Sequence, residues 1–189
     1  MTRTQYYTAT SIDGFIADAD DSLEWLFEAA SGDDDPGGRF ATFYAGIGAM
    51  AMGATTYRWV LDHEQLLDHP ERWTGYYGDT PCWVFTHGEL PRIPDVPLTF
   101  VQGSVAPVHQ AMAAAAGGKH LWVVGGGDLV GQFADEGLLD DVFLGVAPVF
   151  LGSGAPLLPR RILSPAMTLA AVDHDAGFVH LHYTLRDRG

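Results

Sequence analysis

The sequence predicts an α/β fold in which helices cover both faces of a mixed, mostly parallel sheet. Short apolar runs without polar alternation recur along the chain, and Leu121–Val124 is the clearest. Such runs are typical of strands buried on both faces. Most of them are followed by apolar residues at helical spacing, as in Leu129–Ala134. This alternation favours parallel strands joined by crossover helices, and the length suits a single domain over residues 1–189.

The expected elements follow from residue type and spacing. Aromatic and β-branched residues indicate strands, whereas apolar residues three and four apart indicate helices. The expected strands are Gln5–Ile12, Phe15–Ala17, Ala49–Met52, Pro81–Thr86, Leu98–Val101, Leu121–Val124, Val142–Ala147, Met167–His174 and Phe178–Arg186. The expected helices are Leu23–Ala30, Phe40–Ile47, Tyr57–Leu67, Pro107–Ala116 and Leu129–Ala134.

Capping and breaking residues support these boundaries. Ser22 is a plausible N-cap for the first helix, and Pro107 suits the first turn of a later one. Ser31–Gly38 is rich in Asp and Gly, so we expect a loop there. We also expect His69–Asp79 to be irregular and Pro148–Leu158 to form an apolar, glycine-punctuated loop.

The charge balance excludes some classes of partner. The formal net charge is −14, so the chain has no basic surface with which to neutralise nucleic acid or anionic lipid. The N-terminus has no apolar signal core, and no apolar run is long enough to span a membrane. The single cysteine, Cys82, excludes an intrachain disulfide framework. We therefore expect a cytoplasmic protein without nucleic-acid or membrane partners.

A glycine turn is the first candidate binding site. Gly125, Gly126 and Gly127 follow the Leu121–Val124 strand directly, and Asp128 and Leu129 begin the next helix. A strand, glycine turn and helix start present bare backbone N–H groups to an anion, and glycine permits close approach of a ligand. A tight turn that binds nothing is the alternative at this stage.

A second junction of the same kind begins at Gly53. Thr55 and Thr56 follow it at the start of the next predicted helix. Their hydroxyl groups could cap that helix or bind phosphate, and the sequence leaves both roles open.

No group of residues has convincing metal-ligand spacing. The acidic stretch Asp18–Glu24 lacks the glycine of a calcium loop, because its sixth residue is Leu23. His180 and His182 share a strand face, but the sequence places no third ligand beside them. We expect no metal site.

The order of the motifs resembles a known family. Ser-Ile-Asp-Gly-Phe-Ile-Ala at residues 11–17 precedes Met-Gly-Ala-Thr-Thr-Tyr at 52–57, Thr86-His87 ends the next strand, and Val-Val-Gly-Gly-Gly occupies 123–127. Together they resemble the dihydrofolate reductase-like superfamily, and more closely the reductase domain of riboflavin biosynthesis (the RibD C-terminal type). The resemblance spans nearly the whole chain and implies a three-layer dihydrofolate reductase-like fold.

The resemblance also implies a nicotinamide cofactor, NADPH with NADH as a possibility. Its pyrophosphate would bind at the two glycine junctions, and its adenosine ribose would lie near Thr86 and His87. Ala17 would border the nicotinamide. The residues implied as cofactor-binding are Ala17, Gly53, Thr55, Thr56, Thr86, His87, Gly125, Gly126, Gly127, Asp128 and Leu129.

A planar small-molecule substrate would stack near Trp25, Tyr44 and Phe150. Asp13 is the nearest candidate acid, and the alternative is a turn aspartate that caps its own backbone. Tyr44 is a second candidate catalytic residue.

Departures from the family's pattern narrow the expected activity. Gly37 stands where dihydrofolate reductase has its proton-relay carboxylate, which disfavours classical folate reduction. Val124 and Tyr44 replace a glutamate and an arginine of the riboflavin-pathway enzymes, and Ala54 replaces an arginine that contacts the 2′-phosphate. We expect a reductase acting on a pterin-, pyrimidine- or related compound. The alternative is a ligand-binding module of the same fold without turnover.

Apolar segments near the C-terminus favour a homodimer.

Overall fold

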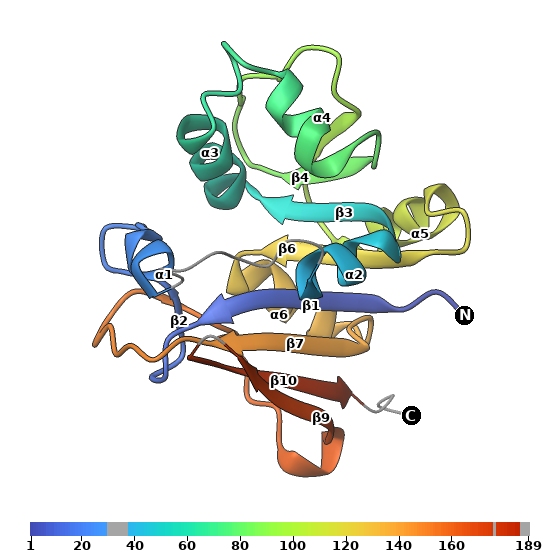
Figure 1. Cartoon of the computed structure of the whole chain (residues 1–189). Coiled ribbons are helices and arrows are strands. Elements are labelled where there is room, and N and C mark those ends of the chain that lie inside the picture. The colour runs from blue at the N-terminus through green and yellow to red at the C-terminus, as the bar shows by residue number, and fades with distance from the viewer. Residues whose placement is uncertain (30–37, 176, 186–189) are drawn as a thin grey trace.

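A computed structural model describes residues 1–29, 38–175 and 177–185. Its main sheet has eight strands in the order β5-β4-β3-β6-β1-β7-β10-β9 (Figure 1). The six strands from β5 to β7 are parallel, and β10 runs antiparallel to both of its neighbours. The strands are β1 (Thr4–Thr10), β3 (Ile47–Gly53), β4 (Cys82–Phe85), β5 (Leu98–Val101), β6 (His120–Gly125), β7 (Asp141–Val146), β9 (Met167–Asp175) and β10 (Phe178–Leu185).

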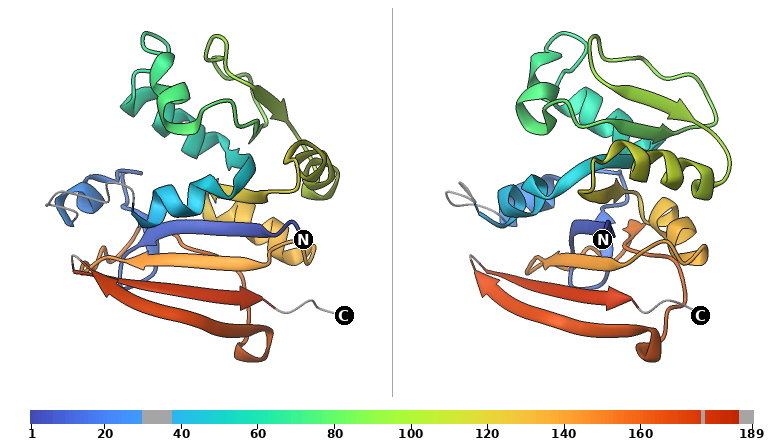
Figure 2. Two further views of the ribbon diagram at one scale, coloured as in Figure 1. Left: turned by 45° about the vertical axis from the view of Figure 1, so that its right-hand side comes forward. Right: turned by 90° about the vertical axis from the view of Figure 1, so that its right-hand side faces the viewer.

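Helices cover both faces of this sheet, which confirms the predicted fold class. One face packs against α2 (Arg39–Ala45), α3 (Ala54–His63) and α4 (Glu71–Tyr77). The other packs against α5 (Val105–Ala115) and α6 (Gly127–Asp135), and Figure 2 shows the two layers on opposite sides. The side chains of successive strand residues point to opposite faces, so Trp122 packs with the first layer and Val123 with the second.

Smaller elements lie at the carboxyl ends of the parallel strands. There β2 (Phe15–Ala17) pairs with β8 (Ala155–Pro156), and α1 (Glu24–Ala29) follows β2. A single 3₁₀ turn spans Ser164–Ala166 before β9. These elements cover the carboxyl ends of the parallel strands, which is where open α/β sheets ordinarily bind ligands.

Some expected boundaries are wrong. The segment expected to be irregular contains α4, which forms because Trp73 and Tyr77 lie one helical turn apart and pack together. Helix α5 begins at Val105 rather than Pro107, because the Ser104 hydroxyl accepts a hydrogen bond from the amide of Ala106.

Other expectations cannot be compared with the structure. The loop expected at Ser31–Gly38 lies outside the described residues except for Gly38, and Arg186 also lies outside them. In the described part of the chain, every helix is too short or too polar to cross a lipid bilayer.

Asp141 fastens three neighbouring strands at the amino end of β1. Its carboxylate, 2% exposed, accepts hydrogen bonds from Arg3 at 2.6 and 2.7 Å. Gln5 donates to it at 3.2 Å, and the His182 ring of β10 lies 2.9 Å away. Burial by itself would raise the pKa of Asp141, but the hydrogen bonds from Arg3, His182 and Gln5 outweigh it and lower the pKa.

Replacing this carboxylate should destabilise the fold in a pH-dependent way. Folding lowers the pKa of this carboxyl from about 3.9, its value in the unfolded chain, so the ionised carboxylate stabilises the fold above that pH. The stabilisation is lost as the pH falls through the lower pKa of the folded state. Asp141→Asn should therefore cost about 2 kcal/mol near neutral pH, measured by urea unfolding, and less towards pH 3. The exposed Asp62→Asn is the control. An Asp141→Asn cost that does not depend on pH contradicts this role.

Candidate functional site

The two glycine junctions lie side by side at the carboxyl edge of the sheet. Strands β3 and β6 are parallel neighbours, and Met52 pairs with Gly125. A side-chain carbon added at Gly53 would lie 3.6 Å from the amide nitrogen of Gly126. One added at Gly125 would lie 3.2 Å from the hydroxyl oxygen of Thr56. Segments about 70 residues apart in the sequence thus form one surface of almost bare backbone.

Helix α6 begins at this surface with unused backbone donors. Gly126 is its N-cap, and no side chain caps the helix. The first N–H groups of a helix have no partner within it, so those of Gly127, Asp128 and Leu129 remain available to an anion. Gly127 is required by packing, because a side-chain carbon there would lie 2.3 Å from the carbonyl oxygen of Pro156.

Helix α3 begins beside it in the same manner. Gly53 is its N-cap, and no side-chain hydroxyl caps the helix. The capping role considered for Thr55 and Thr56 is therefore not the one that they play here. Thr55 is exposed and Thr56 half-buried, and neither hydroxyl hydrogen-bonds to another described residue.

A cavity of about 400 Å³ lies in front of both helix starts. It adjoins a second cavity of about 550 Å³ at the ends of β4 and β5, and the two share Thr86, His87 and Gln102. The Thr86 hydroxyl already donates to the carbonyl oxygen of Gly88 at 2.8 Å. Of the residues expected to bind cofactor, the first cavity is lined by Gly53, Thr55, Thr86, His87, Gly126, Asp128 and Leu129.

An ion pair offsets the acidic charge at the start of α6. The Asp128 carboxylate accepts hydrogen bonds from Gln132 and from the Arg160 guanidinium, each at 3.0 Å. These two donors lower the pKa of Asp128. Arg160 also binds Asp135 at 2.7 Å, so its own charge is shared between two carboxylates.

The loop between β7 and β8 closes the edge near β2. The amides of Leu151 and Gly152 donate to the Asp13 carboxylate at 3.1 and 2.7 Å. The Ser11 hydroxyl donates to the same carboxylate at 2.6 Å and is the main reason why the pKa of Asp13 is lowered. A carboxyl with a lowered pKa is ionised at neutral pH, so Asp13 is poorly suited to donate a proton.

Ala17 of β2 lies beside the end of this loop, and both it and Trp25 of α1 are almost fully buried. Ala17 pairs with Ala155, and a side-chain carbon at Gly154 would lie 2.0 Å from the Ala17 carbonyl oxygen. Phe150, in contrast, is 71% exposed.

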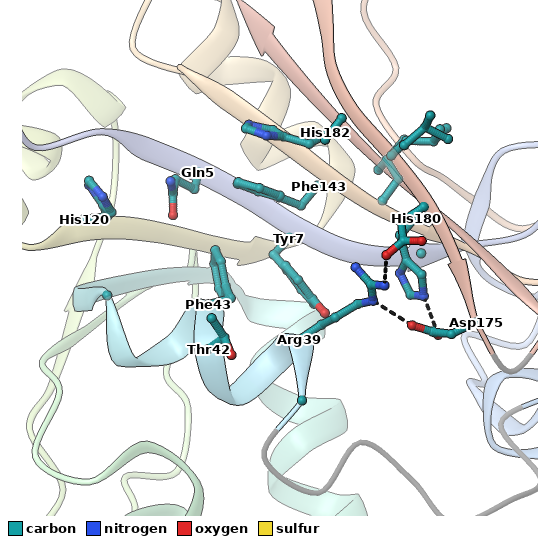
Figure 3. A pocket seen from close by; sticks show the side chains of 18 residues that line it. Gln5, Tyr7, Arg39, Thr42, Phe43, His120, Phe143, Asp175, His180 and His182 are labelled. Atoms are coloured by element: carbon teal, nitrogen blue, oxygen red, sulfur yellow. Dashed lines mark hydrogen bonds and ion pairs between the residues drawn. The ribbon is translucent and has the colours of Figure 1, made fainter.

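A groove of about 830 Å³ lies between α2 and strands β1, β7, β10 and β9. Figure 3 shows aromatic rings on its walls. The Tyr7 and Phe43 rings stack at 4.5 Å between centroids, and Phe143 stacks on His182 at 4.0 Å. Stacked rings of this kind suit a flat ligand.

Each charged group in the groove already faces an opposite one. Arg39 binds Asp173 and Asp175, and these bonds lower the pKa of both carboxyls. The His180 ring lies 2.8 Å from Asp175, as Figure 3 shows. The groove therefore has little uncompensated positive charge to offer a ligand.

Comparison with known proteins decides the family. The model of the RibD C-terminal domain matches residues 50–181. The chain belongs to the RibD C-terminal domain family. The uncharacterized protein YwjB of Bacillus subtilis (strain 168) is 32% identical over 181 residues, which are 96% of this chain and 97% of YwjB.

Solved structures share the fold. A putative riboflavin biosynthesis protein from Shewanella sp. PV-4 matches with a TM-score of 0.79 and 23% identity, covering 98% of this chain and 99% of that one. A diaminohydroxyphosphoribosylaminopyrimidine deaminase/5-amino-6-(5-phosphoribosylamino)uracil reductase from Thermotoga maritima matches with a TM-score of 0.62 and 18% identity, covering 98% and 57%. The expected dihydrofolate reductase-like fold is thereby confirmed, and family membership supports a reductase-like activity.

In this RibD C-terminal domain, Tyr44 lies apart from the groove. Its hydroxyl donates to the carbonyl oxygen of Tyr77 at 2.8 Å, and its ring packs against Phe40 and Trp122. Burial raises the pKa of Tyr44. Phe43, one residue earlier on α2, lines the groove instead.

Sequence reasoning missed the groove residues Tyr7, Phe43 and Phe143. The alternation of faces along β1 could have indicated Tyr7, because buried Tyr6 packs with the opposite layer. Clusters of three or more His, Cys, Asp or Glu side chains suited to a metal ion are absent from the described residues.

The glycines of the turn should respond differently to a methyl group. Gly127→Ala should destabilise the domain by about 2 kcal/mol in urea unfolding, because the new carbon would meet the Pro156 and Leu157 carbonyls. Gly126→Ala should change stability by less than about 0.5 kcal/mol, because a carbon there meets no atom within 4 Å. Equal costs at both positions contradict the packing described.

Proposed function

We propose that this domain is an NAD(P)H-dependent reductase that transfers hydride to a small, planar, unphosphorylated substrate of pterin, pyrimidine or related type. The observation that carries the proposal is the pair of helix starts without side-chain caps that meet at one glycine-lined cavity. Two sets of free backbone donors converging on one space suit a diphosphate. The family, rather than this geometry, points to a reductase.

The residues of the first cavity would hold the cofactor's diphosphate. The amides of Gly127 to Leu129 donate from α6, and the hydroxyls of Thr55 and Thr56 donate from α3. The adenosine half would extend into the adjoining cavity past His87 and Gln102. NADPH is the form that the family resemblance implies, and NADH is the alternative.

The substrate would occupy the groove, with its ring against Tyr7 and Phe43. The register that pairs Tyr6 with Val123 places Tyr7 beside Val124, one residue before Gly125. Tyr7 thus stands on the strand next to the one that leads into the glycine turn, near which Ala17 and Trp25 would border the nicotinamide. The reduced nicotinamide supplies the hydride, and the domain supplies orientation and exclusion of water.

The charges of the groove argue against a phosphorylated substrate. Arg39 is its one lining arginine or lysine among the described residues, and it is bound to Asp173 and Asp175. A phosphate would have to displace these carboxylates in a chain of net charge −14. Classical folate reduction is not proposed, because no carboxylate is identified at the relay position.

Asp13 has a positioning role in this account. Ionised and bound to the amides of Leu151 and Gly152, it fixes the loop that carries Phe150 over the edge of the sheet. Because both carboxylate oxygens already accept hydrogen bonds from the protein, we assign Asp13 a structural role and not proton transfer.

We also propose a cytoplasmic homodimer that pairs through the free end of the sheet. β9 is an edge strand, and its residues Leu169 and Val172 are 50 and 62% exposed. Val179 of the neighbouring β10 is 42% exposed. Exposed apolar edges of this kind commonly pair with another chain. Light scattering at micromolar concentration should give twice the 20.4 kDa chain mass, and Val172→Asp should halve it. A monomeric wild type rejects the dimer.

The cofactor assignment predicts a clean loss of binding at Gly126. Gly126 lines the cavity, and a side-chain carbon added there would meet no protein atom within 4 Å. Gly126→Val should therefore keep the wild-type melting temperature yet weaken NADPH and NADH binding at least about tenfold in titration calorimetry. Gly75→Ala, at an equally open position in α4, is the control. A folded Gly126→Val domain with unchanged affinity for both nucleotides contradicts the assignment.

The groove assignment separates two neighbouring residues of α2. The test uses any pterin, pyrimidine or quinone that the wild-type enzyme is found to reduce. For this substrate, Phe43→Leu should raise KM about tenfold, because a stacked ring is removed from the groove. Tyr44→Phe should leave kcat and KM nearly unchanged and cost about 1 kcal/mol of stability, because the hydroxyl's bonds to the Tyr77 carbonyl and the Met50 sulfur are lost. A large fall in kcat for Tyr44→Phe would instead support Tyr44 as a catalytic residue.

A further inference from the structure

We infer that the adenosine side of the cofactor site is built for NADH rather than NADPH, because its two joined cavities carry acidic and neutral groups but no lysine or arginine among their described lining residues. This inference rests on the proposed function. It concerns which dinucleotide the same site selects.

The adenosine would meet the same lining residues in more than one pose. The two cavities share Thr86, His87 and Gln102, so they form one continuous space leading away from the glycine turn. A dinucleotide with its diphosphate at the start of α6 places the adenosine ribose within that space. A 2′-phosphate would therefore face one or other of the same two sets of lining residues.

These lining residues are unfavourable to a further dianion. The charged side chains among them are Glu89 and Asp128, with His87 as the single group able to become cationic. Phosphates are ordinarily bound by arginine or lysine in charge-assisted hydrogen bonds. A ribose 2′-hydroxyl needs the opposite, an acceptor such as a carboxylate, and Glu89 is an exposed carboxylate of this kind.

The nearby arginines already have partners within the protein. The Arg92 guanidinium lies over the Phe100 ring, 5.1 Å from its centroid, and donates to the carbonyl oxygen of Leu98. Arg160 binds Asp128 and Asp135. Each of these cations would have to leave a partner in order to reach a phosphate.

Arg58 is the arginine best placed to bind a 2′-phosphate and so to favour NADPH. It is exposed on α3, one turn after the cavity residue Ala54, and it lines neither cavity. An extended arginine on this face of the helix is long enough to turn towards a bound phosphate, so the experiment includes its removal.

The test measures dissociation constants of NADH and NADPH for the full chain by titration calorimetry. At about pH 8, histidine side chains contribute little positive charge. The wild type should bind NADH at least as tightly as NADPH. Ala54→Arg, which places a cation in the lining, should tighten NADPH about tenfold or more and leave NADH within about twofold. The control is Ala114→Arg, at an exposed position of α5 away from both cavities. It adds the same charge and should change neither the affinity for NADH nor the affinity for NADPH.

Two further variants keep the inference open to rejection if Ala54→Arg does not fold. Glu89→Gln should weaken NADH about threefold or more without weakening NADPH. Arg58→Ala should change the ratio of the two affinities by less than about twofold. A wild type that binds NADPH tenfold more tightly overturns the inference, and loss of that preference in Arg58→Ala would assign the phosphate to Arg58. Binding of neither nucleotide overturns the proposed function itself.

Discussion

The site depends on one constraint, the absence of side chains where β3 and β6 end next to each other. Gly53 and Gly125 allow two parallel strands to turn into two helices within contact of one another, so that both helix starts face one cavity. Gly127 then lets the start of α6 touch the backbone of Pro156 and Leu157. A side chain at Gly127 would separate α6 from the loop that closes the edge of the sheet.

That loop is held in place by hydrogen bonds near both of its ends. Asp13 holds its first part through two amides, and the Tyr6 hydroxyl and the Gly14 carbonyl hold its end at Leu157. β1 has a different role on each face, because Tyr7 lines the groove while Tyr6 packs with the residues of α6 in the core. At the opposite end of β1, the buried carboxylate of Asp141 fixes the strands that form the groove wall.

The sequence predicted the fold class and the two glycine junctions, since strand-glycine-helix order is local information. It failed at α4, because the packing of Trp73 against Tyr77 is recognised only once the segment is known to be buried. It could not reveal the groove, which joins α2 to β9 and β10 across more than 120 residues. Nor could it show that the Asp13 carboxylate accepts a hydrogen bond from the amide of Gly152, or that the Thr86 hydroxyl donates to the carbonyl oxygen of Gly88.

The central claim is that the starts of α6 and α3 together bind a dinucleotide diphosphate. A crystal structure of the domain soaked with NADH or NADPH tests it most directly. The account predicts phosphate oxygens within hydrogen-bond distance of the amides of Gly127 to Leu129, with the nicotinamide ring beside Ala17. A dinucleotide bound only elsewhere, with those amides facing solvent, would contradict it.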